Sequence, residues 1–232
     1  MTDKILITGH TGYIGTNLWE YFKYDPEYQI NGIDFPIDLC NCTNLPDVDY
    51  VIHLAAHTGV RDSIKNPHKY FDNNINSCNI IFNRYGGTST KILFASTSAV
   101  KEMASPYAMS KYACEVLSPE NCIIMRFFTV YGGINYRKNM LYGLAKDDKL
   151  EYITDQSRDY THVDDVCRAI KLIIEKGQCD KIYEVGHGNP IQNRDFLNKI
   201  GYTKKLPYKE VTGESISTCA DNTTLRELGW FA

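Results

Sequence analysis

The chain has 232 residues, of which 43% are hydrophobic and 23% charged, and such a chain can bury a core large enough to fold unaided. Its 25 lysines and arginines stand against 28 acidic residues, for a formal net charge of −3, so we expect no basic surface for nucleic acid or anionic lipid. No apolar run approaches the roughly 20 residues of a membrane-spanning helix, and the N-terminus lacks the layout of a signal peptide. We therefore expect a cytoplasmic protein that binds neither nucleic acid nor membrane.

The eight cysteines do not have the spacing of a disulfide framework. They are scattered along the chain, no CxxC pair occurs, and no group of cysteines and histidines has the spacing of zinc ligands. We expect buried free thiols, because a free cysteine usually behaves as a small hydrophobic side chain. No metal site is expected.

Short apolar runs alternate with helical patterns, which is typical of an α/β domain with a largely parallel sheet. Near-continuous apolar strands such as residues 51–55 indicate a sheet covered on both faces. Strands are expected at Lys4–Thr8, Gln29–Asp34, Tyr50–Ala55, Lys91–Ser96, Cys122–Phe127 and Lys181–Val185. Helices are expected at Tyr13–Tyr24, Pro67–Tyr85, Pro106–Leu117 and Val163–Lys176.

The alternation of strands and helices is lost after Phe128 and returns only near Arg158. We therefore expect two parts that are each discontinuous in sequence. Residues 1–130 and 158–187 would form the sheet domain, and residues 131–157 and 188–232 would form a small substrate-binding cap beside it.

A glycine-rich loop joins the first expected strand to the first expected helix, with Gly9, Gly12 and Gly15 in a GxxGxxG spacing. In this context the motif indicates a dinucleotide site. Gly9 can make the tight turn, Gly12 lets the backbone approach a pyrophosphate, and Gly15 allows close helix–strand packing, with the helix N-terminus facing the anion. Tyr13 and Ile14 lie in the same motif and are assigned to the same site. An ordinary turn between strand and helix is the alternative.

Asp34 ends the second expected strand. A carboxylate at this place can accept both hydroxyls of an adenosine ribose and repels a 2′-phosphate. No arginine follows it in residues 35–37, so the sequence predicts NAD rather than NADP. The end of the third strand is assigned to the same cofactor site through Leu54, Ala55 and Ala56.

Asp38 and Leu39 resemble the adenine-contacting segment of a next strand, but they follow Asp34 almost directly. A parallel crossover needs about a dozen residues or more. The helix that usually joins two such strands must therefore be missing, and we expect the sheet edge to be truncated or non-parallel. Both residues are assigned to the NAD site.

Tyr107 and Lys111 are four residues apart on an expected helix and so share one face. A free tyrosine, with a pKa of about 10, is a poor base at neutral pH, but a nearby ammonium group favours the phenolate, which could then exchange a proton with a substrate hydroxyl. Thr97 and Ser98 follow at the end of the fourth strand, where open α/β sheets bind ligands. Together these residues are candidates for catalysis. Thr97 and Ser98 are also assigned to binding substrate, and Lys111 to binding the nicotinamide ribose of the cofactor.

Several stretches resemble one family from end to end. They are TGHTGYIG, HLAAHTGV, FASTSAV, SPYAMSKYACE, RFFTVYG, RDYTHVDDV, YEVG and ADNTTLRELGW. The chain looks like an extended short-chain dehydrogenase/reductase of the nucleotide-sugar epimerase/dehydratase family, though shorter than typical members. The resemblance implies a Rossmann-type, doubly wound parallel sheet and a catalytic trio of Thr97, Tyr107 and Lys111, with Ser98 as the second choice for the hydroxyl. It also implies that Arg158 contacts the substrate diphosphate, and that the chain forms a homodimer through the helices at Pro67–Tyr85 and Pro106–Leu117.

Within this family, residues 53–61 and 126–132 most resemble the UDP-glucuronate 4-epimerases. Thr129 stands where galactose-type epimerases carry an asparagine, and the resemblance implies that it holds the sugar carboxylate. Arg137 matches the arginine of that pocket if one extra residue is allowed, and Asn139 is assigned to the substrate site with it. Hydroxyls and a guanidinium are good partners for a carboxylate. The alternative is that Thr129 caps a strand and that Arg137 is solvated.

Some residues depart from the family pattern. Lys101 and Glu102 follow Val100 where relatives have an aromatic residue and a glycine, and the loop to Tyr107 is short. Dehydratases carry an Asp-Glu pair where this chain has residues 98–99, and decarboxylases carry a glutamate at the second of these positions. Both chemistries are therefore disfavoured.

The sequence thus predicts NAD-dependent epimerisation at C4 of a UDP-hexuronic acid or UDP-hexose through a transient 4-keto intermediate. A reductase of a 4-keto nucleotide sugar would use the same trio and would consume NADH or NADPH. A non-catalytic protein that binds NAD or a nucleotide sugar is a further alternative, which the intact pair of Tyr107 and Lys111 disfavours.

Overall fold

The computed structural model describes residues 2–34, 39–42, 44–210 and 215–232. Within these residues the chain forms a six-stranded sheet in the order β2-β1-β3-β4-β5-β9, and every neighbouring pair is parallel. The strands are β1 (Asp3–Thr8), β2 (Tyr28–Ile33), β3 (Tyr50–His53), β4 (Lys91–Thr97), β5 (Cys122–Phe127) and β9 (Ile182–Val185). Each predicted strand is present. β3 ends before Leu54 because the chain turns there toward Thr8, whose hydroxyl oxygen accepts a hydrogen bond from the backbone N–H of Ala55.

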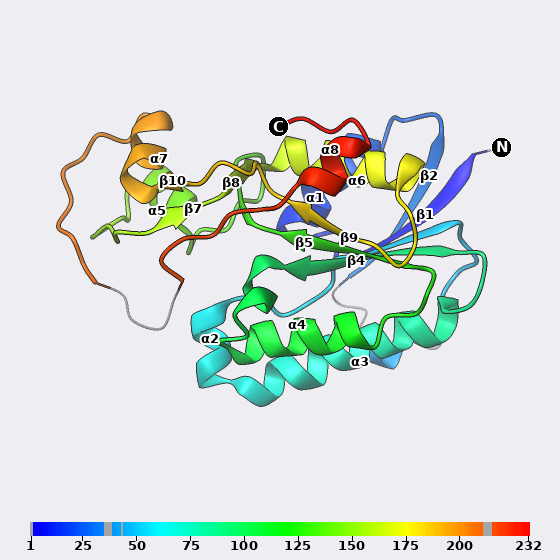
Figure 1. The fold of residues 1–232 in the computed structure, drawn as a ribbon. Helices are drawn as coiled ribbons and strands as arrows, with labels where there is room; N and C mark the ends of the chain where they lie inside the picture. Colours follow the sequence, from blue (N-terminus) through cyan, green and yellow to red (C-terminus); the bar gives the residue numbers. More distant parts are fainter. Residues whose placement is uncertain (1, 35–38, 43, 211–214) are drawn as a thin grey trace.

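Helices cover both faces of the sheet (Figure 1). On one face lie α1 (Tyr13–Phe22), α6 (Val163–Lys176) and the short α8 (Thr223–Glu227), and on the other lie α2 (Val60–Lys65), α3 (Pro67–Tyr85) and α4 (Pro106–Val116). Successive residues of a strand point to opposite faces, so Ile5 and Ile7 pack in the core beside α1 and α6 while Leu6 packs in the core beside α3. The predicted Rossmann-type, doubly wound fold is confirmed.

The sheet ends at β2 on one side in the described part of the chain, so the predicted truncated edge is confirmed, and β2 is parallel to β1. The prediction of a strand at Leu39 is wrong. Leu39 begins a 3-10 turn (Leu39–Asn41), and its side chain, 7% exposed, packs in the core cluster that also contains Phe82 of α3. The segment is too short for a crossover, so it forms a turn beside α3 in which Leu39 is the buried residue. Asp38 lies outside the described residues.

The segments around residues 129–162 and 191–199 form a smaller body beyond the carboxyl ends of the strands (Figure 1). A small cluster of Ala145, Leu150, Ile153 and Leu197 is buried within it. Its elements are β6 (Thr129–Tyr131), α5 (Leu141–Lys146), β7 (Ser157–Arg158), β8 (Tyr160–His162), β10 (Ile191–Gln192) and α7 (Asn193–Lys199). β6 pairs with β8 in parallel, and β7 pairs with β10 in antiparallel orientation.

The division into a sheet domain and a cap stays a prediction. The residues near 225–230, which were assigned to the cap, pack instead with the sheet domain. Leu225 and Trp230, which fall in the predicted cap range, pack in the core beside α6. The indole Nε1 of Trp230 donates to the carbonyl of Asp165 at 3.0 Å. These two side chains bury apolar surface against the sheet domain, so the last residues lie with that domain.

Asp159 joins the two bodies between β7 and β8. Its carboxylate is fully buried and accepts hydrogen bonds from the backbone N–H groups of His187 (2.7 Å), Gly188 (2.9 Å) and Ala220 (2.9 Å). A buried carboxylate is tolerated when its oxygens are hydrogen-bonded in this way. The side chain thus fixes three distant stretches of the chain relative to one another.

All eight cysteines lie among the described residues and are free thiols. Four of them, Cys78, Cys114, Cys122 and Cys167, are buried, whereas Cys219 is exposed. Searching the described residues gives no helix with the length and apolar character to span a membrane.

Candidate active site

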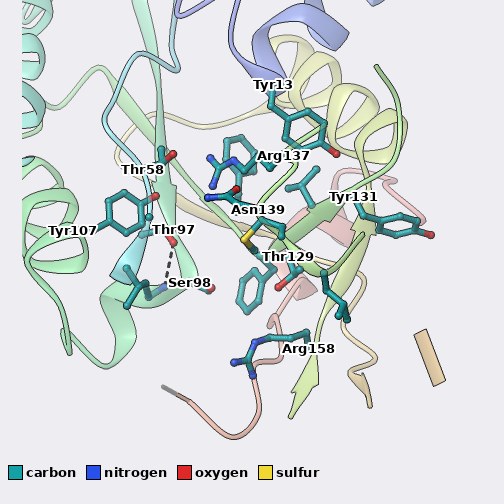
Figure 2. Close-up of a pocket in the computed structure, with 18 of the residues that line it drawn as sticks. Tyr13, Thr58, Thr97, Ser98, Tyr107, Thr129, Tyr131, Arg137, Asn139 and Arg158 are labelled. Carbon is teal, nitrogen blue, oxygen red and sulfur yellow. Dashed lines mark hydrogen bonds between the residues drawn. The ribbon is translucent and has the colours of Figure 1, made fainter. Parts of the chain in front are cut away.

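A cavity of about 1070 Å³ opens at the carboxyl ends of the sheet strands, between the sheet and the smaller body. Its lining runs from the glycine loop at Gly9 and Gly12, past Thr97 and Tyr107, to Thr129 and Arg158 on the smaller body. Figure 2 shows Tyr107 and Thr97 on one wall, and Arg137 and Asn139 on the wall that faces them. The cavity therefore contains residues from both predicted halves of the site.

The glycine loop has the shape that a pyrophosphate requires. Gly9 has a φ of +75°, and a Cβ there would lie 2.8 Å from the backbone nitrogen of Ala55, while a Cβ on Gly15 would lie 2.1 Å from the carbonyl oxygen of Gly9. Both positions exclude a side chain, so the loop lies close against the end of β3. At Gly12, which lines the cavity, the nearest atom to a Cβ would be the carbonyl oxygen of Gly9 at 3.1 Å. No side chain among the described residues caps α1, which leaves the N–H groups of its first turn for an anion.

Asp34 follows β2 directly and lies beside this loop. Its Oδ2 atom accepts hydrogen bonds from the backbone N–H (2.9 Å) and from the hydroxyl (2.7 Å) of Thr11. The carboxylate is therefore held next to the phosphate-binding turn, which is the place expected of a group that contacts the adenosine ribose. The loop and this aspartate together fit a dinucleotide with a free 2′-hydroxyl.

The structure brings most of the predicted cofactor residues to the cavity. Those that line it are Gly9, Gly12, Tyr13, Ile14, Gly15, Leu54, Ala56 and Lys111. Three others, although described, are outside that lining. Asp34 binds the glycine loop, Ala55 binds Thr8, and Leu39 packs in the core.

The helix that carries Tyr107 and Lys111 begins at a well-defined cap. The hydroxyl oxygen of Ser105 accepts a hydrogen bond from the N–H of Ala108 at 3.2 Å, and Pro106 occupies the first helical position, which is where a proline is best tolerated. Tyr107 and Lys111 then both line the cavity. Lys111 is only 2% exposed, and its Nζ lies 4.2 Å from the ring centroid of Phe94.

His53, at the end of β3, lies in the same buried region as Lys111. Its Nδ1 shares a 2.7 Å hydrogen bond with the hydroxyl of Thr8. Burial, aided by the positive charge of Lys111, lowers the pKa of His53 to about 3. The imidazole is therefore neutral at physiological pH and adds no second charge beside the lysine.

Asn74 supports the helix that carries Tyr107 and Lys111, and sequence reasoning missed it. Its side chain is fully buried on α3, and its amide nitrogen donates to the hydroxyl of Ser110 (3.0 Å) and to the carbonyl of His57 (3.1 Å). Its carbonyl oxygen accepts from the N–H of His57 at 2.8 Å. The signal in the sequence that could have predicted this is the position of Asn74, one helical turn after Tyr70 on the buried face of α3.

Thr97 and Ser98 lie where β4 passes into a 3-10 turn (Ser98–Lys101). The Oγ1 atom of Thr97 accepts a hydrogen bond from the N–H of Ala99 at 3.3 Å, drawn as a dashed line in Figure 2. Because this bond uses an acceptor site of the hydroxyl, its proton remains available to a ligand oxygen. Both residues line the cavity.

Two groups of charged residues, which the sequence did not predict, hold the two ends of this turn. Ser96 donates to Glu115 at 2.5 Å, and Arg126 binds the same carboxylate through Nε (3.0 Å) and Nη2 (2.6 Å). At the other end of the turn, the ammonium of Lys101 pairs with Glu184 at 2.7 Å. The departure from the family pattern at Lys101 is thus matched by a nearly buried acidic partner.

The facing wall carries Thr129, Arg137, Asn139 and Arg158, all of which line the cavity. In Figure 2, Arg158 lies further from Tyr107 than Arg137 does. Burial raises the pKa of Tyr70 to about 12, and the positive charge of Arg137 acts in the opposite direction. The guanidinium is therefore within electrostatic reach of Tyr70, whose ring packs edge-on against Tyr107 with centroids 6.2 Å apart.

Comparison with known proteins identifies the class to which this fold and site belong. The model of the NAD dependent epimerase/dehydratase family matches residues 5–186. The chain therefore belongs to that family, and NAD is its cofactor, as the glycine loop and Asp34 predict.

Individual relatives give a closer comparison. The chain is 30% identical over 206 residues to a UDP-glucuronate 4-epimerase of Thermodesulfobacterium geofontis, a match covering 77% of this chain and 62% of that protein. It is 25% identical to the protein CapI of Staphylococcus aureus, over 90% of this chain and 86% of that one. A crystal structure of the UDP-glucuronic acid 4-epimerase from Bacillus cereus, in complex with UDP-glucuronic acid and NAD, superposes with a TM-score of 0.85 at 26% identity, covering 99% of this chain and 93% of that chain.

The position of Asp34 predicts how the cofactor preference responds to substitution. In Asp34→Arg, the positive charge attracts a 2′-phosphate and the acceptor for the ribose hydroxyls is lost, so we expect the ratio of the dissociation constants for NADP and NAD to fall at least tenfold. Isothermal titration with both cofactors measures it. Asp34→Asn is the control, because it disturbs the contact with Thr11 without adding a cation. An unchanged ratio in Asp34→Arg would remove this residue from the ribose site.

Proposed function

We propose that the chain is a UDP-sugar 4-epimerase whose preferred substrate is a UDP-hexuronic acid, with a neutral UDP-hexose as the broader class. The observation that carries this proposal is a single cavity lined on one wall by Thr97, Tyr107 and Lys111 and on the other by Thr129 and Arg137. The first wall offers groups for proton transfer, and the second offers groups for a carboxylate. The similarity to UDP-glucuronate 4-epimerases supports the same conclusion.

Tyr107, as the phenolate, takes the proton of the sugar 4-hydroxyl and later returns it. The ammonium of Lys111, one helical turn away, stabilises the negative charge of the phenolate. Thr97 donates a hydrogen bond to the 4-oxygen, assisted by Ser98, and so stabilises the charge that develops there. NAD, when bound, supplies the exchange of a hydride at C4 in both directions.

Thr129 and Arg137 hold the sugar carboxylate in this proposal, with Asn139 beside them. A guanidinium can bind a carboxylate through two parallel hydrogen bonds, which fixes its orientation as well as its position. Arg158, further along the same wall, contacts the substrate diphosphate. The sugar is thus anchored at both ends while its C4 faces Tyr107. After oxidation at C4, the 4-keto sugar leaves its carboxylate contacts, turns over in the cavity and receives the hydride on its other face, because return to the same face would only restore the substrate.

The decisive experiment is incubation of the purified protein with UDP-, dTDP- and GDP-sugars without added cofactor, with products identified by mass and NMR. Epimerisation keeps the mass of the sugar and consumes no external cofactor. Loss of water would identify a dehydratase, and a requirement for stoichiometric NADH or NADPH would identify a reductase. If no sugar is changed, the chain is a non-catalytic protein that binds NAD or a nucleotide sugar. Each of these three results would refute the proposal.

The dimer implied by the family resemblance is proposed to form on the outer face of α4. Met109 (48% exposed), Tyr112 (41%) and Val116 (68%) lie there, three and four residues apart, and so form one apolar stripe. A second copy of the chain covering this stripe would bury it.

Light scattering after size exclusion tests the dimer. We expect Val116→Glu to convert the dimer into a monomer, because a charge would be buried in an apolar contact. Tyr24→Glu, at another exposed aromatic residue (85%), should leave the mass unchanged. A monomeric wild-type protein, or a dimer that survives Val116→Glu, would contradict the proposed interface.

The catalytic role of Tyr107 predicts a large loss of turnover. In Tyr107→Phe the general base is absent, so we expect kcat to fall by about 10²- to 10⁴-fold while NAD still binds. The matched control is Tyr112→Phe on the same helix, whose hydroxyl is not part of the described cavity lining. If Tyr107→Phe keeps wild-type turnover, this tyrosine is not the base.

The carboxylate pocket predicts a change in sugar preference. Replacing Thr129 by asparagine removes a hydroxyl donor near the charged group, so we expect kcat/KM for UDP-glucuronate to fall about 10- to 100-fold more than for UDP-glucose, as for a lost hydrogen bond to a charged group. Thr129→Ser retains the hydroxyl and should keep most of the preference. Equal losses for both sugars in Thr129→Asn would exclude a role in reading the carboxylate.

A further inference from the structure

The segment between β6 and the substrate residue Arg137 crosses the start of α1. We call residues 132–135 the strap. Gly132, Gly133 and Asn135 have φ values of +85°, +64° and +52°, the left-handed backbone region that costs energy for most residues with a side chain. Glycine adopts this region freely, and asparagine tolerates it better than most residues.

Close packing fixes the two glycines of the strap. A Cβ on Gly132 would lie 2.1 Å from Nε2 of His162, and a Cβ on Gly133 would lie 2.3 Å from Oδ1 of Asn17 and 2.4 Å from a methyl group of Val163. The strap therefore lies directly against α1 and the first turn of α6, with no room for a side chain at either position.

Hydrogen bonds join the strap to α1. The hydroxyl of Tyr13 donates to the carbonyl of Gly132 at 2.9 Å. Asn17 both donates to the carbonyl of Ile134 at 2.8 Å and accepts from its N–H at 3.0 Å. Figure 2 shows that the Tyr13 hydroxyl points away from Tyr107, so this phenol acts on the strap and not on the reacting end of the cavity.

Asn135 joins the strap to the glycine loop itself. Its amide nitrogen donates to the carbonyl of Thr11 at 2.9 Å, and Thr11 is the residue whose N–H and hydroxyl bind Asp34. Asn135 also lines the cavity together with Gly12 and Tyr13. The phosphate-binding turn is therefore held between Asp34 on one side and the strap on the other.

We infer that the strap is a clamp that retains NAD, with Tyr13 and Asn135 as its fastening residues. A dinucleotide whose pyrophosphate lies on Gly12 is released fully only when this wall of the cavity moves, and that movement must break the bonds from Tyr13 and Asn135. Since release and entry pass through the same opening, the need to break these bonds slows both dissociation and association, and slow dissociation is what retains the cofactor. The reason for retention rests on the proposed function, because an epimerase uses one NAD for both halves of its cycle. The inference that the strap slows release requires only that the chain binds NAD, whatever reaction it catalyses.

The test measures the release of NADH from the folded protein, without any sugar. Energy transfer from tryptophan to bound NADH reports occupancy, because Trp19 lies on α1 with its ring 5.2 Å from that of His10 in the glycine loop. Mixing with excess NAD in a stopped-flow instrument gives the dissociation rate. The variants are Tyr13→Phe, which removes one hydroxyl, and Asn135→Gly, which removes the amide and accepts the left-handed backbone.

The matched control is Tyr85→Phe. The hydroxyl of Tyr85 also donates to a backbone carbonyl, that of Pro46, at 2.8 Å, but it lies on α3 away from the strap. We expect dissociation to be five- to tenfold faster in Tyr13→Phe and in Asn135→Gly, to be faster still when both are combined, and to be unchanged in Tyr85→Phe.

A dissociation rate in Tyr13→Phe within twofold of that in Tyr85→Phe, with an unchanged circular dichroism spectrum, would overturn the clamp. Because no sugar is present, failure of the proposed epimerase activity leaves this measurement intact. Conversely, an active epimerase whose variants release NADH at the wild-type rate would refute the clamp alone.

Discussion

The site depends on the approach of one backbone to another, where the glycine loop meets the end of β3. At Gly9 the chain is so close to Leu54 and Ala55 that a methyl group would overlap backbone atoms. This contact sets the direction of α1 and leaves its first N–H groups facing the crevice where the strand order reverses, between β1 and β3. Ligands of open α/β sheets bind at such a crevice, and β4 brings Thr97 to the same edge from two strands away.

The two walls of the cavity are held by different physical means. On the sheet side, buried polar contacts fix the reactive groups: Asn74 supports the helix of Tyr107, and Glu115 with Arg126 supports the strand of Thr97. On the other side, aromatic packing dominates, as in the stacked rings of Tyr160 and Phe196 with centroids 3.7 Å apart. A wall whose side chains are held by hydrogen bonds and a wall of packed rings match the roles proposed for each, the first for proton transfer and the second for binding the sugar nucleotide.

The sequence predicts the sheet well because its central strands β3, β4 and β5 carry near-continuous apolar runs between helical patterns. It predicts the glycine loop and the pair of Tyr107 and Lys111 because both depend on local spacing. β7 and β10, with two residues each, are too short to show any periodicity, so their pairing follows only from tertiary contacts.

Buried polar residues were missed for a related reason. Asn74 and Glu115 are helix residues that one sequence alone would place at the surface, because their partners lie far along the chain. The strand expected at Leu39 was wrong because the local pattern does not reveal that this side chain fills a gap beside α3.

The carboxylate of Asp159 has a consequence for how a small chemical change would spread through the molecule. Its donors, the N–H groups of His187, Gly188 and Ala220, belong to two segments far apart in sequence, and this one buried side chain joins both of them to the turn between β7 and β8. An amide in its place would put a donor where these N–H groups need an acceptor, and an unsatisfied buried N–H is costly. Exchange of a single oxygen for nitrogen at this position would therefore loosen the joint between the two bodies, although Asp159 is not among the residues that line the cavity.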